Sequence, residues 1–234
     1  MPENTGLLIS FDGTDSSGKE TQAKRLAARL RAAGYVVHSL TTPDYTTPSG
    51  RELKMRLQNM VGNWHQTPWQ EKLGYFAANR AEHRQEVIDA LAQGEVVIYD
   101  RYVPSSLAFI TIEARQEDQA VSRTFIQEAV AAEEYDKNRM PKEDISIFLD
   151  VPVEIAARLL EQRKAALKDG DEYTDHSALQ QKLYDEYVRL CGDNPAHCVR
   201  LAGTSQGRLL TIQAMEDRIW QELAQRFPRF FAAT

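Results

Sequence analysis

Five short apolar runs recur along the chain and alternate with longer segments of mixed polar and apolar residues. The runs are LLISF (residues 7–11), YVVHSL (35–40), EVVIY (95–99), ISIFL (145–149) and HCVRL (197–201). Runs of this length that are rich in β-branched side chains are typical of buried strands. Because parallel strands need long crossovers, the alternation predicts an α/β fold with a five-stranded parallel sheet and helices on both faces.

The segments between the apolar runs carry the spacing of amphipathic helices. In residues 20–33, Leu26 and Leu30 lie on one helical face, and Gly34 then provides a common helix end. The other predicted helices cover residues 50–61, 68–92, 118–135, 153–167, 177–191 and 208–227. Two polar loops also stand out, residues 41–49 and 164–175. Doubly wound sheets bind their ligands in loops at the carboxyl ends of strands, so these loops are candidate binding segments.

Length and composition are those of an ordinary globular protein. The chain has 234 residues, of which 42% are hydrophobic and 26% charged, so we expect one domain over residues 1–234. The formal net charge of −6 argues against a general nucleic-acid-binding protein, which needs a basic face. A small anionic ligand is still compatible with this charge, because lysines and arginines can gather locally.

Cysteine usage and the first residues indicate the compartment. Cys191 and Cys198 are too few for a disulfide framework and lack zinc-ligand spacing, so two reduced thiols are expected. The first residues, MPENTG, show no signal-peptide pattern, and no apolar run approaches membrane-spanning length. The sequence therefore predicts a cytoplasmic protein with no membrane partner.

A glycine-rich segment follows the first apolar run directly and precedes a predicted helix. Its residues are Gly13, Thr14, Asp15, Ser16, Ser17, Gly18 and Lys19. The spacing is that of a Walker A phosphate-binding loop, in the strand–loop–helix context that the motif requires. Backbone N–H groups of such a loop point at phosphate oxygens, and the following helix adds the positive end of its dipole. Lys19 is expected to reach the β- and γ-phosphates of a nucleoside triphosphate.

The residue after Lys19 departs from the motif. A serine or threonine usually stands there to bind Mg²⁺, but this chain has Glu20, with Thr21 behind it. Either Thr21 supplies the hydroxyl, or Glu20 holds the metal through water. The alternative for the whole segment is a glycine-rich turn that binds nothing.

Three segments, taken together, carry a family resemblance. They are FDGTDSSGKETQ (residues 11–22), FAANRAEH (76–83) and DRYVPSSLAF (100–109). In motif, order and spacing they resemble thymidylate kinase, over about residues 7–187. The resemblance implies a P-loop kinase that transfers the γ-phosphoryl group of ATP to dTMP, giving dTDP and ADP in dTTP biosynthesis. It also implies Mg²⁺ as cofactor and a homodimer.

The resemblance assigns roles residue by residue. ATP would bind at the loop residues 13–19 together with Glu20 and Thr21, with Asp15 beside the transferring phosphates and with Thr21 and Asp100 positioning Mg²⁺. The acceptor would be held by Tyr45 near its phosphate, Phe76 stacked on the base, Arg80 and Ser106 at the base edge, Arg101 on the phosphate, Phe109 against the sugar, and Asp171 and Tyr173 over the nucleotide.

Two positions depart from the family pattern. Phe109 replaces the usual tyrosine, which removes a hydroxyl but keeps the ring. Asp44 stands where the family commonly has an arginine, and its carboxylate would repel a phosphate.

Each acceptor role has a plain structural alternative. Phe76 could be core, Arg80 could belong to a solvated helix face, and Asp100 could simply pair with Arg101 at a strand end. The DRY segment follows the EVVIY run directly, on the ligand side of the predicted sheet. This position favours function over structure.

The implied chemistry needs positive charge more than a general base. A nucleoside monophosphate has a second phosphate pKa of about 6, so at neutral pH it is largely a dianion and already a nucleophile. The phosphate loop contains no arginine, but Arg158 and Arg163 follow the ISIFL run. We predict that Arg163 stabilises the transferring phosphoryl group and that Arg158 supports it, on a lid of about residues 158–175. The alternative is a basic helix face in water.

Two other functions stay open. One is a kinase for another nucleoside monophosphate or for a deoxynucleoside, in which Asp12 could serve as base. The other is a nucleotide-binding protein that has lost catalysis, for which Glu20 and Asp44 argue. The C-terminal RFPRFF segment (residues 226–231) is expected to pack against the chain's own helices or to form a subunit contact.

Overall fold

The computed structural model describes residues 6–167 and 177–231 and has a parallel sheet at its centre. Five strands form it in the order β2–β3–β1–β4–β5. Their bounds are β1 Leu7–Asp12, β2 Val37–Thr41, β3 Val96–Asp100, β4 Ile145–Asp150 and β5 Cys198–Ala202. Every neighbouring pair is parallel, so the predicted fold class is confirmed.

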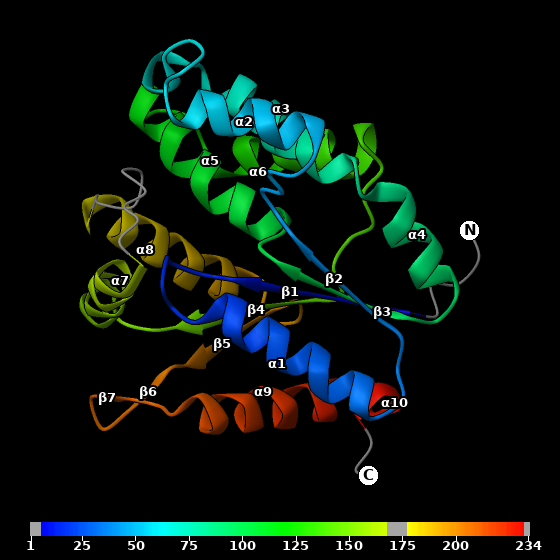
Figure 1. The fold of residues 1–234 in the computed structure, drawn as a ribbon. Helices are drawn as coiled ribbons and strands as arrows, with labels where there is room; N and C mark the ends of the chain where they lie inside the picture. The colour runs from blue at the N-terminus through cyan, green and yellow to red at the C-terminus, as the bar shows by residue number, and fades with distance from the viewer. Residues whose placement is uncertain (1–5, 168–176, 232–234) are drawn as a thin grey trace.

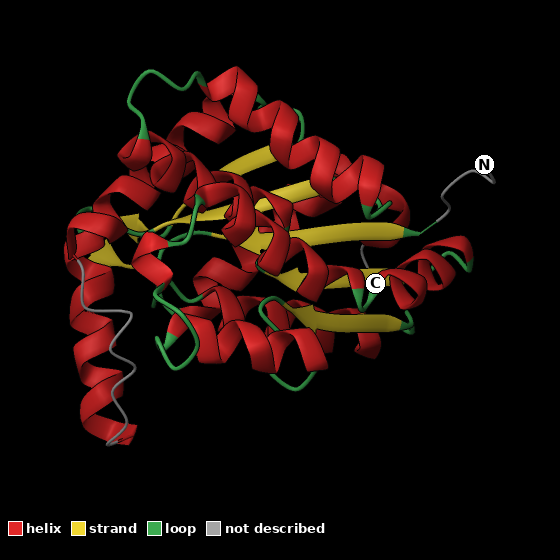
Figure 2. Cartoon of the chain, turned by 90° about the horizontal axis from the view of Figure 1, so that it is seen from above, coloured by secondary structure: helices red, strands yellow, loops and turns green. Residues whose placement is uncertain are grey.

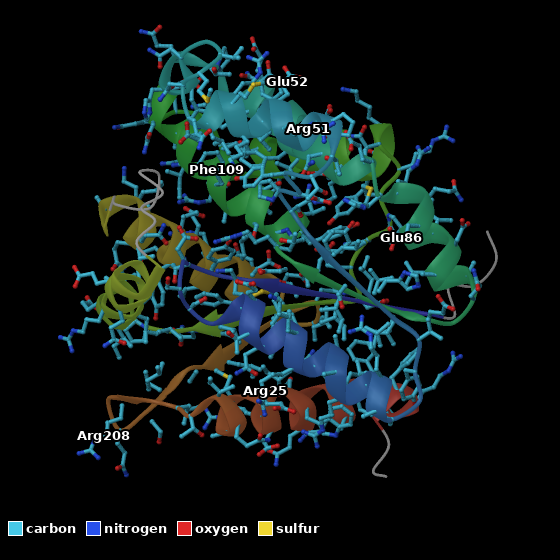
Figure 3. The ribbon with its side chains drawn as sticks, viewed as in Figure 1. Arg25, Arg51, Glu52, Glu86, Phe109 and Arg208 are labelled. Atoms are coloured by element: carbon cyan, nitrogen blue, oxygen red, sulfur yellow. A yellow bond between two sulfur atoms is a disulfide. The ribbon has the colours of Figure 1, made fainter. Side chains whose placement is uncertain are left out.

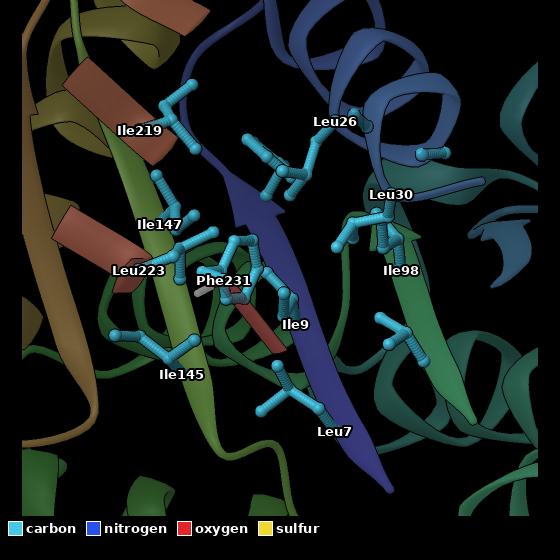
Figure 4. Close-up of a cluster of buried hydrophobic side chains, with 14 of the residues drawn as sticks. Leu7, Ile9, Leu26, Leu30, Ile98, Ile145, Ile147, Ile219, Leu223 and Phe231 are labelled. Carbon is cyan, nitrogen blue, oxygen red and sulfur yellow. The ribbon is translucent and has the colours of Figure 1, made fainter. Parts of the chain in front are cut away.

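One face of the sheet is covered by helices from the two ends of the chain (Figure 1). These helices are α1 Lys19–Ala32, α9 Ile212–Arg226 and α10 Pro228–Phe231. Leu26, Ile219 and Leu223 pack against inward side chains of the strands, as Figure 4 shows. Phe231 is 2% exposed and lies in the same core, so the C-terminal phenylalanines pack against the chain's own helices.

The other face carries the longer middle part of the chain, and Figure 2 shows helices lying over the strands from above. Its elements are α3 Trp69–Ala81, α4 Arg84–Ala92, α5 Val103–Glu117, α6 Arg123–Ala131 and the π-helix η2 Ala132–Lys137. Leu8, Val97 and Tyr99 from the strands enter this second core. Helix α2 Pro48–Leu57 packs on α3, and the short 3₁₀ helix η1 Trp64–Gln66 joins these two helices.

The carboxyl ends of the strands face a group of elements from the last third of the chain. These are α7 Val153–Leu167, α8 Ser177–Asp193 and a small hairpin of β6 Thr204–Ser205 and β7 Arg208–Leu209 (Figure 1). Helix α8 packs against α5, β4 and β5. It therefore closes one side of the edge at which parallel sheets bind ligands.

The two cysteines correct one prediction. Cys191 on α8 and Cys198 at the start of β5 form a disulfide, with Cα atoms 4.7 Å apart. The expectation of two reduced thiols is therefore wrong for this structure. The reason is that the chain turns back directly after α8, which places the two side chains opposite each other.

The helices differ from the predictions chiefly in four places: one helix was not predicted, and three predicted helices have other bounds. Residues 103–117 form α5, which was not predicted because it is apolar on most sides and rich in β-branched residues. The predicted helix 118–135 begins only at Arg123, and the predicted helix 68–92 breaks at Glu82 and His83. The predicted helix 208–227 begins at Ile212, after the hairpin. In the described ranges no helix is long and apolar enough to cross a lipid bilayer.

Candidate active site

The loop between β1 and α1 has the geometry of a phosphate cradle. Gly18 caps α1 with φ 93°, and Gly13 has φ 143°, conformations that favour glycine. A Cβ atom at Gly13 would also lie only 3.3 Å from the Phe148 ring and from Ser17 Oγ. The first turn of a helix leaves N–H groups without intrahelical partners, so the start of α1 at Lys19 can offer donors to a phosphate.

Lys19 lies inside this loop. Its side chain is buried, and Nζ donates a hydrogen bond to the carbonyl oxygen of Thr14. Burial, together with the nearby positive charge of Arg101, lowers the pKa of Lys19 to about 7 against the opposing effect of Asp15. A phosphate bound in the loop would add negative charge beside Lys19, raise its pKa again and so favour the charged ammonium form.

Asp15 and Arg101 join the loop to the end of β3. Arg101 Nη2 forms an ion pair with Asp15 Oδ1, and Nη1 donates to the carbonyl oxygen of Gly13 at 3.0 Å. Gln180 on α8 holds the other Asp15 oxygen at 2.8 Å. Burial alone would raise the pKa of Asp15, but Arg101, Lys19 and the Gln180 hydrogen bond lower it overall. Arg101 has a φ of 68°, a strained backbone conformation for a residue other than glycine. Residues in such conformations are frequent at functional sites.

Asp12, the last residue of β1, connects the start of the loop to neighbouring segments through hydrogen bonds. Its carboxylate is fully buried and accepts hydrogen bonds from Ser10, Ser146 and Ser105 hydroxyls and from the Tyr102 N–H. All these donors are protein groups, so Asp12 has a structural role. A role as base for a nucleoside hydroxyl is not supported.

A cavity of about 840 Å³ begins at Asp15 and extends between α2, α3, α5 and α8. The side chains that the resemblance assigns to the acceptor and that the structure describes all line it: Tyr45, Phe76, Arg80, Arg101, Ser106 and Phe109. The size is that of a typical small-ligand site. One hollow thus connects the phosphate loop with both arginines.

Aromatic rings form the wall of this cavity on the side of α3 and α5. Phe76 on α3 and Phe109 on α5 meet edge to face, with ring centroids 5.5 Å apart; Phe109 is labelled in Figure 3. Trp64 packs against the other side of Phe76 at 6.0 Å. Because both phenylalanines are only partly buried and line the cavity, their exposed edges and faces are open to a planar base.

Arg80 lies at the inner end of the cavity and is fully buried. It forms an ion pair with Glu134 from η2, and its Nη2 donates to Ser106 Oγ at 3.0 Å. Burial would lower the pKa of Arg80, but Glu134 raises it overall. Nε has no hydrogen-bond partner in the described protein and remains a donor for a ligand. The alternative that Arg80 belongs to a solvated helix face is therefore excluded.

The loop around Asp44 differs from the expectation. Asp44 Oδ1 accepts hydrogen bonds from the N–H and hydroxyl of Thr46, and Oδ2 lies 3.1 Å from His83 Nε2. Burial raises the pKa of Asp44, but the Thr46 and His83 contacts lower it overall. Asp44 is absent from the cavity lining, so its carboxylate shapes the loop and does not oppose an acceptor phosphate.

A second cavity of about 340 Å³ lies on the other side of the phosphate loop. Residues 16–22 form its floor, and its walls are mostly apolar: Val151, Leu159, Leu209, Leu210, Ile212 and Met215. Figure 3 shows Arg208 at the tip of the hairpin beside it. Glu20 lines this cavity and pairs with Lys24 at 2.6 Å.

Asp100, at the carboxyl end of β3, fits a metal-positioning role. Its Oδ1 is buried and has no hydrogen-bond partner among the described atoms, and burial raises its pKa despite the nearby Lys19. Thr21 lines the second cavity. The described residues contain no cluster of three or more metal ligands. Magnesium bound with a nucleotide needs only one or two carboxylates, because water and phosphates supply the rest, so the residues fit Mg²⁺.

The predicted lid residues are placed only in part. Arg158 lies on α7, is exposed and lines neither cavity. Arg163 also lies on α7, but its side chain is outside the described part of the structure. Asp171 and Tyr173 lie outside the described residues.

Several side chains line the first cavity without having been predicted, among them Gln180, Tyr187 and Lys54. Gln180 holds Asp15 through both its amide atoms, and Tyr187 Oη lies 2.9 Å from Ser105 Oγ. Lys54 lines the cavity from α2. The pattern of apolar and polar residues on α8 or α2 cannot show which helix face meets the cavity. The sequence therefore carries no signal for Gln180, Tyr187 or Lys54.

Comparison with known proteins gives one consistent match. The family model described as thymidylate kinase matches residues 11–206. A thymidylate kinase of Rhodopseudomonas palustris is 28% identical over 94% of this chain and 90% of its own, and a probable thymidylate kinase of Pyrococcus abyssi is 33% identical over 79% and 82%. The solved structure of thymidylate kinase from Candida albicans has a TM-score of 0.69 at 23% identity, covering 97% of this chain and 93% of its own.

Proposed function

Because the chain belongs to the thymidylate kinase family, we infer that its two cavities, one on each side of the phosphate loop, hold the two substrates of that reaction. The protein transfers the γ-phosphoryl group of ATP to dTMP, giving dTDP and ADP. The observation that carries the proposal for the site is the contact between Asp15 and Arg101, which joins the phosphate loop to the larger cavity. ATP would bind on the loop side and dTMP on the Phe76 side.

The chain's own residues supply positioning and charge. The loop amides and Lys19 would hold the β- and γ-phosphates, and Arg101 would contact the acceptor phosphate while Asp15 keeps the guanidinium in place. Thymine would lie against Phe76 and Phe109, with Arg80 Nε and Ser106 Oγ at its edge. The acceptor dianion attacks without a general base, which agrees with the structural role of Asp12.

We propose that Mg²⁺ accompanies ATP and is positioned by Asp100 and Thr21. When bound, the ion neutralises negative charge on the β- and γ-phosphates. The unpartnered Oδ1 of Asp100 supports this choice, and the pairing of Glu20 with Lys24 makes Glu20 the less suitable residue.

The wider organisation is also proposed from the family. One kinase domain would cover residues 1–234, with a lid at about residues 158–175 that brings Arg163 and Arg158 to the phosphates. A homodimer in the cytoplasm is expected, and exposed Phe125 and Met60, at 55% and 70%, offer apolar surface for a partner copy.

Substrate choice can be measured by ADP release. With ATP and Mg²⁺, dTMP is expected to support turnover, dUMP and dCMP much less, and thymidine none, because thymidine lacks the nucleophilic phosphate. The measurement is a coupled assay that compares the four acceptors at equal concentration. Turnover with thymidine, or ATP binding without turnover for any monophosphate, would contradict the proposal.

The lowered pKa of Lys19 predicts a pH dependence of ATP binding. Below pH 7 the ammonium is charged before ATP arrives, whereas above pH 7 it is largely neutral and must take up a proton on binding. ATP affinity should therefore fall as pH rises from 7 to 9, by up to about tenfold per pH unit. Calorimetry at pH 8 in buffers of different ionisation enthalpy should show proton uptake. Equal affinity at pH 7 and 9 would show that Lys19 keeps its charge in the free protein.

A further inference from the structure

The charges that line the acceptor cavity are unevenly paired. Three lysine or arginine side chains of the described chain line it: Lys54, Arg80 and Arg101. Arg80 is paired with Glu134 and Arg101 with Asp15. Each of these two arginines therefore already faces one carboxylate before any ligand enters.

Lys54 differs from the two arginines. It is exposed in the last turn of α2, and no carboxylate among the described residues lies within ion-pair distance of its Nζ. Its Nζ lies 5.8 Å from the centre of the Tyr45 ring, and Tyr45 lines the same cavity. The cationic group thus lies at the cavity wall beside an aromatic face, and the described residues provide no ion-pair partner for it.

The neighbouring basic residues of α2 are engaged elsewhere. Arg51 donates to the carbonyl oxygen of Thr46, and Arg56 pairs with Glu52 at 2.8 Å. Figure 3 labels Arg51 and Glu52 on this helix, where both side chains are exposed. Neither Arg51 nor Arg56 lines the cavity. Lys54 is therefore the one basic residue of α2 that the structure brings to the acceptor site.

The acceptor needs more positive charge than Arg101 supplies. A monophosphate carries a charge of about −1.5 to −2 at pH 7, and it would enter next to Asp15, whose carboxylate offsets the single charge of Arg101. The loop of residues 41–49, which precedes α2, contains no lysine or arginine. Its Asp44 carboxylate contacts Thr46 and His83. Lys19 would be occupied with the ATP phosphates, so Arg101 and Asp15 alone would leave little net positive charge for the acceptor phosphate.

We propose that Lys54 binds the 5′-phosphate of the acceptor nucleotide together with Arg101, which lines the same cavity. This inference rests on the proposed function and names a further acceptor-binding residue for it. The flexible four-carbon stem of lysine lets Nζ leave the Tyr45 ring and follow the phosphate. Lys54 thus selects nucleotides that carry a 5′-phosphate, whereas the aromatic wall at Phe76 and Phe109 contacts the base.

The test uses the full-length protein and a pair of ligands that differ only in the phosphate. Three variants are compared with the parent: Lys54→Met, the conservative Lys54→Arg, and Lys137→Met, whose side chain is 69% exposed and lines neither cavity. The Kd of dTMP and the inhibition constant of thymidine are measured for each, together with the thermal midpoint as a check of folding.

Lys54→Met is expected to weaken dTMP binding about tenfold, the size of one charge-assisted hydrogen bond, and to leave thymidine unchanged. Lys54→Arg should restore most of the dTMP affinity, and Lys137→Met should match the parent. An equal loss for dTMP and thymidine, or no loss for either, would overturn the inference. Absence of dTMP-dependent ADP release in the parent protein would overturn the proposed function instead, so the two failures are distinguishable.

Discussion

Replacing Lys19 by alanine should reduce kcat by at least about 10²–10³-fold, the cost of removing one preorganised group from a transition state. Lys19 is buried within the phosphate loop, and its Nζ contacts the protein only through the carbonyl oxygen of Thr14 among the hydrogen bonds of the described chain. The ammonium group is thus held for the phosphates that the loop would bind. Steady-state ADP release at saturating ATP and dTMP measures the effect.

The Lys19→Ala protein should stay folded, because burying a lysine that makes one hydrogen bond and no ion pair within the described chain is itself costly, and alanine removes that cost. A thermal unfolding curve close to that of the parent would show this, and Lys137→Ala serves as an exposed lysine control. Near-normal turnover in a folded Lys19→Ala protein would contradict the assignment of the loop as the binding site of the ATP phosphates.

Replacing Arg163 by alanine should lower kcat about 10³-fold or more while the KM of dTMP changes little. The residues of the loop from Gly13 to Lys19 include no arginine, so the charge on the transferring phosphoryl group must be met from elsewhere. Arg163 lies on α7, the helix that follows β4 at the carboxyl edge of the sheet. Transition-state arginines in phosphoryl transfer contribute about 10³–10⁵ in rate.

The effect of Arg163→Ala on kcat separates a transition-state role from simple binding. Arg158→Ala should have a smaller effect in the same direction, and Arg226→Ala, whose side chain pairs with Glu222 on α9, should have none. If Arg163→Ala raised only the KM of dTMP, another residue would have to supply the catalytic charge.

The three central strands, β1, β3 and β4, could be predicted from the sequence because each is buried on both sides. A parallel strand covered by helices must be apolar throughout, so LLISF and EVVIY are visible without any tertiary information. Burial on several sides also explains why α5 was not predicted. This helix packs against α3, α6 and α8 and is apolar on most of its faces. Without a polar face, its helical period could not be recognised.

The candidate site could be predicted wherever a motif carries its own geometry. The phosphate loop is such a case, because glycine spacing and the flanking strand and helix define it locally. Partners that come from distant segments could not be predicted. Glu134 lies 54 positions from Arg80, and Gln180 lies 165 positions from Asp15. The orientation of Asp44 depends in the same way on His83, which lies between α3 and α4, 39 positions from Asp44.

The central claim is that two nucleotides lie end to end, with their phosphates meeting at Asp15 and Arg101. A crystal structure of the protein with dTMP and ADP tests it most directly. The account predicts ADP phosphates on the loop of residues 13–19 and dTMP in the larger cavity, with thymine against Phe76 and the 5′-phosphate at Arg101. A dTMP molecule bound outside that cavity, or with its phosphate directed away from Arg101, would contradict the account.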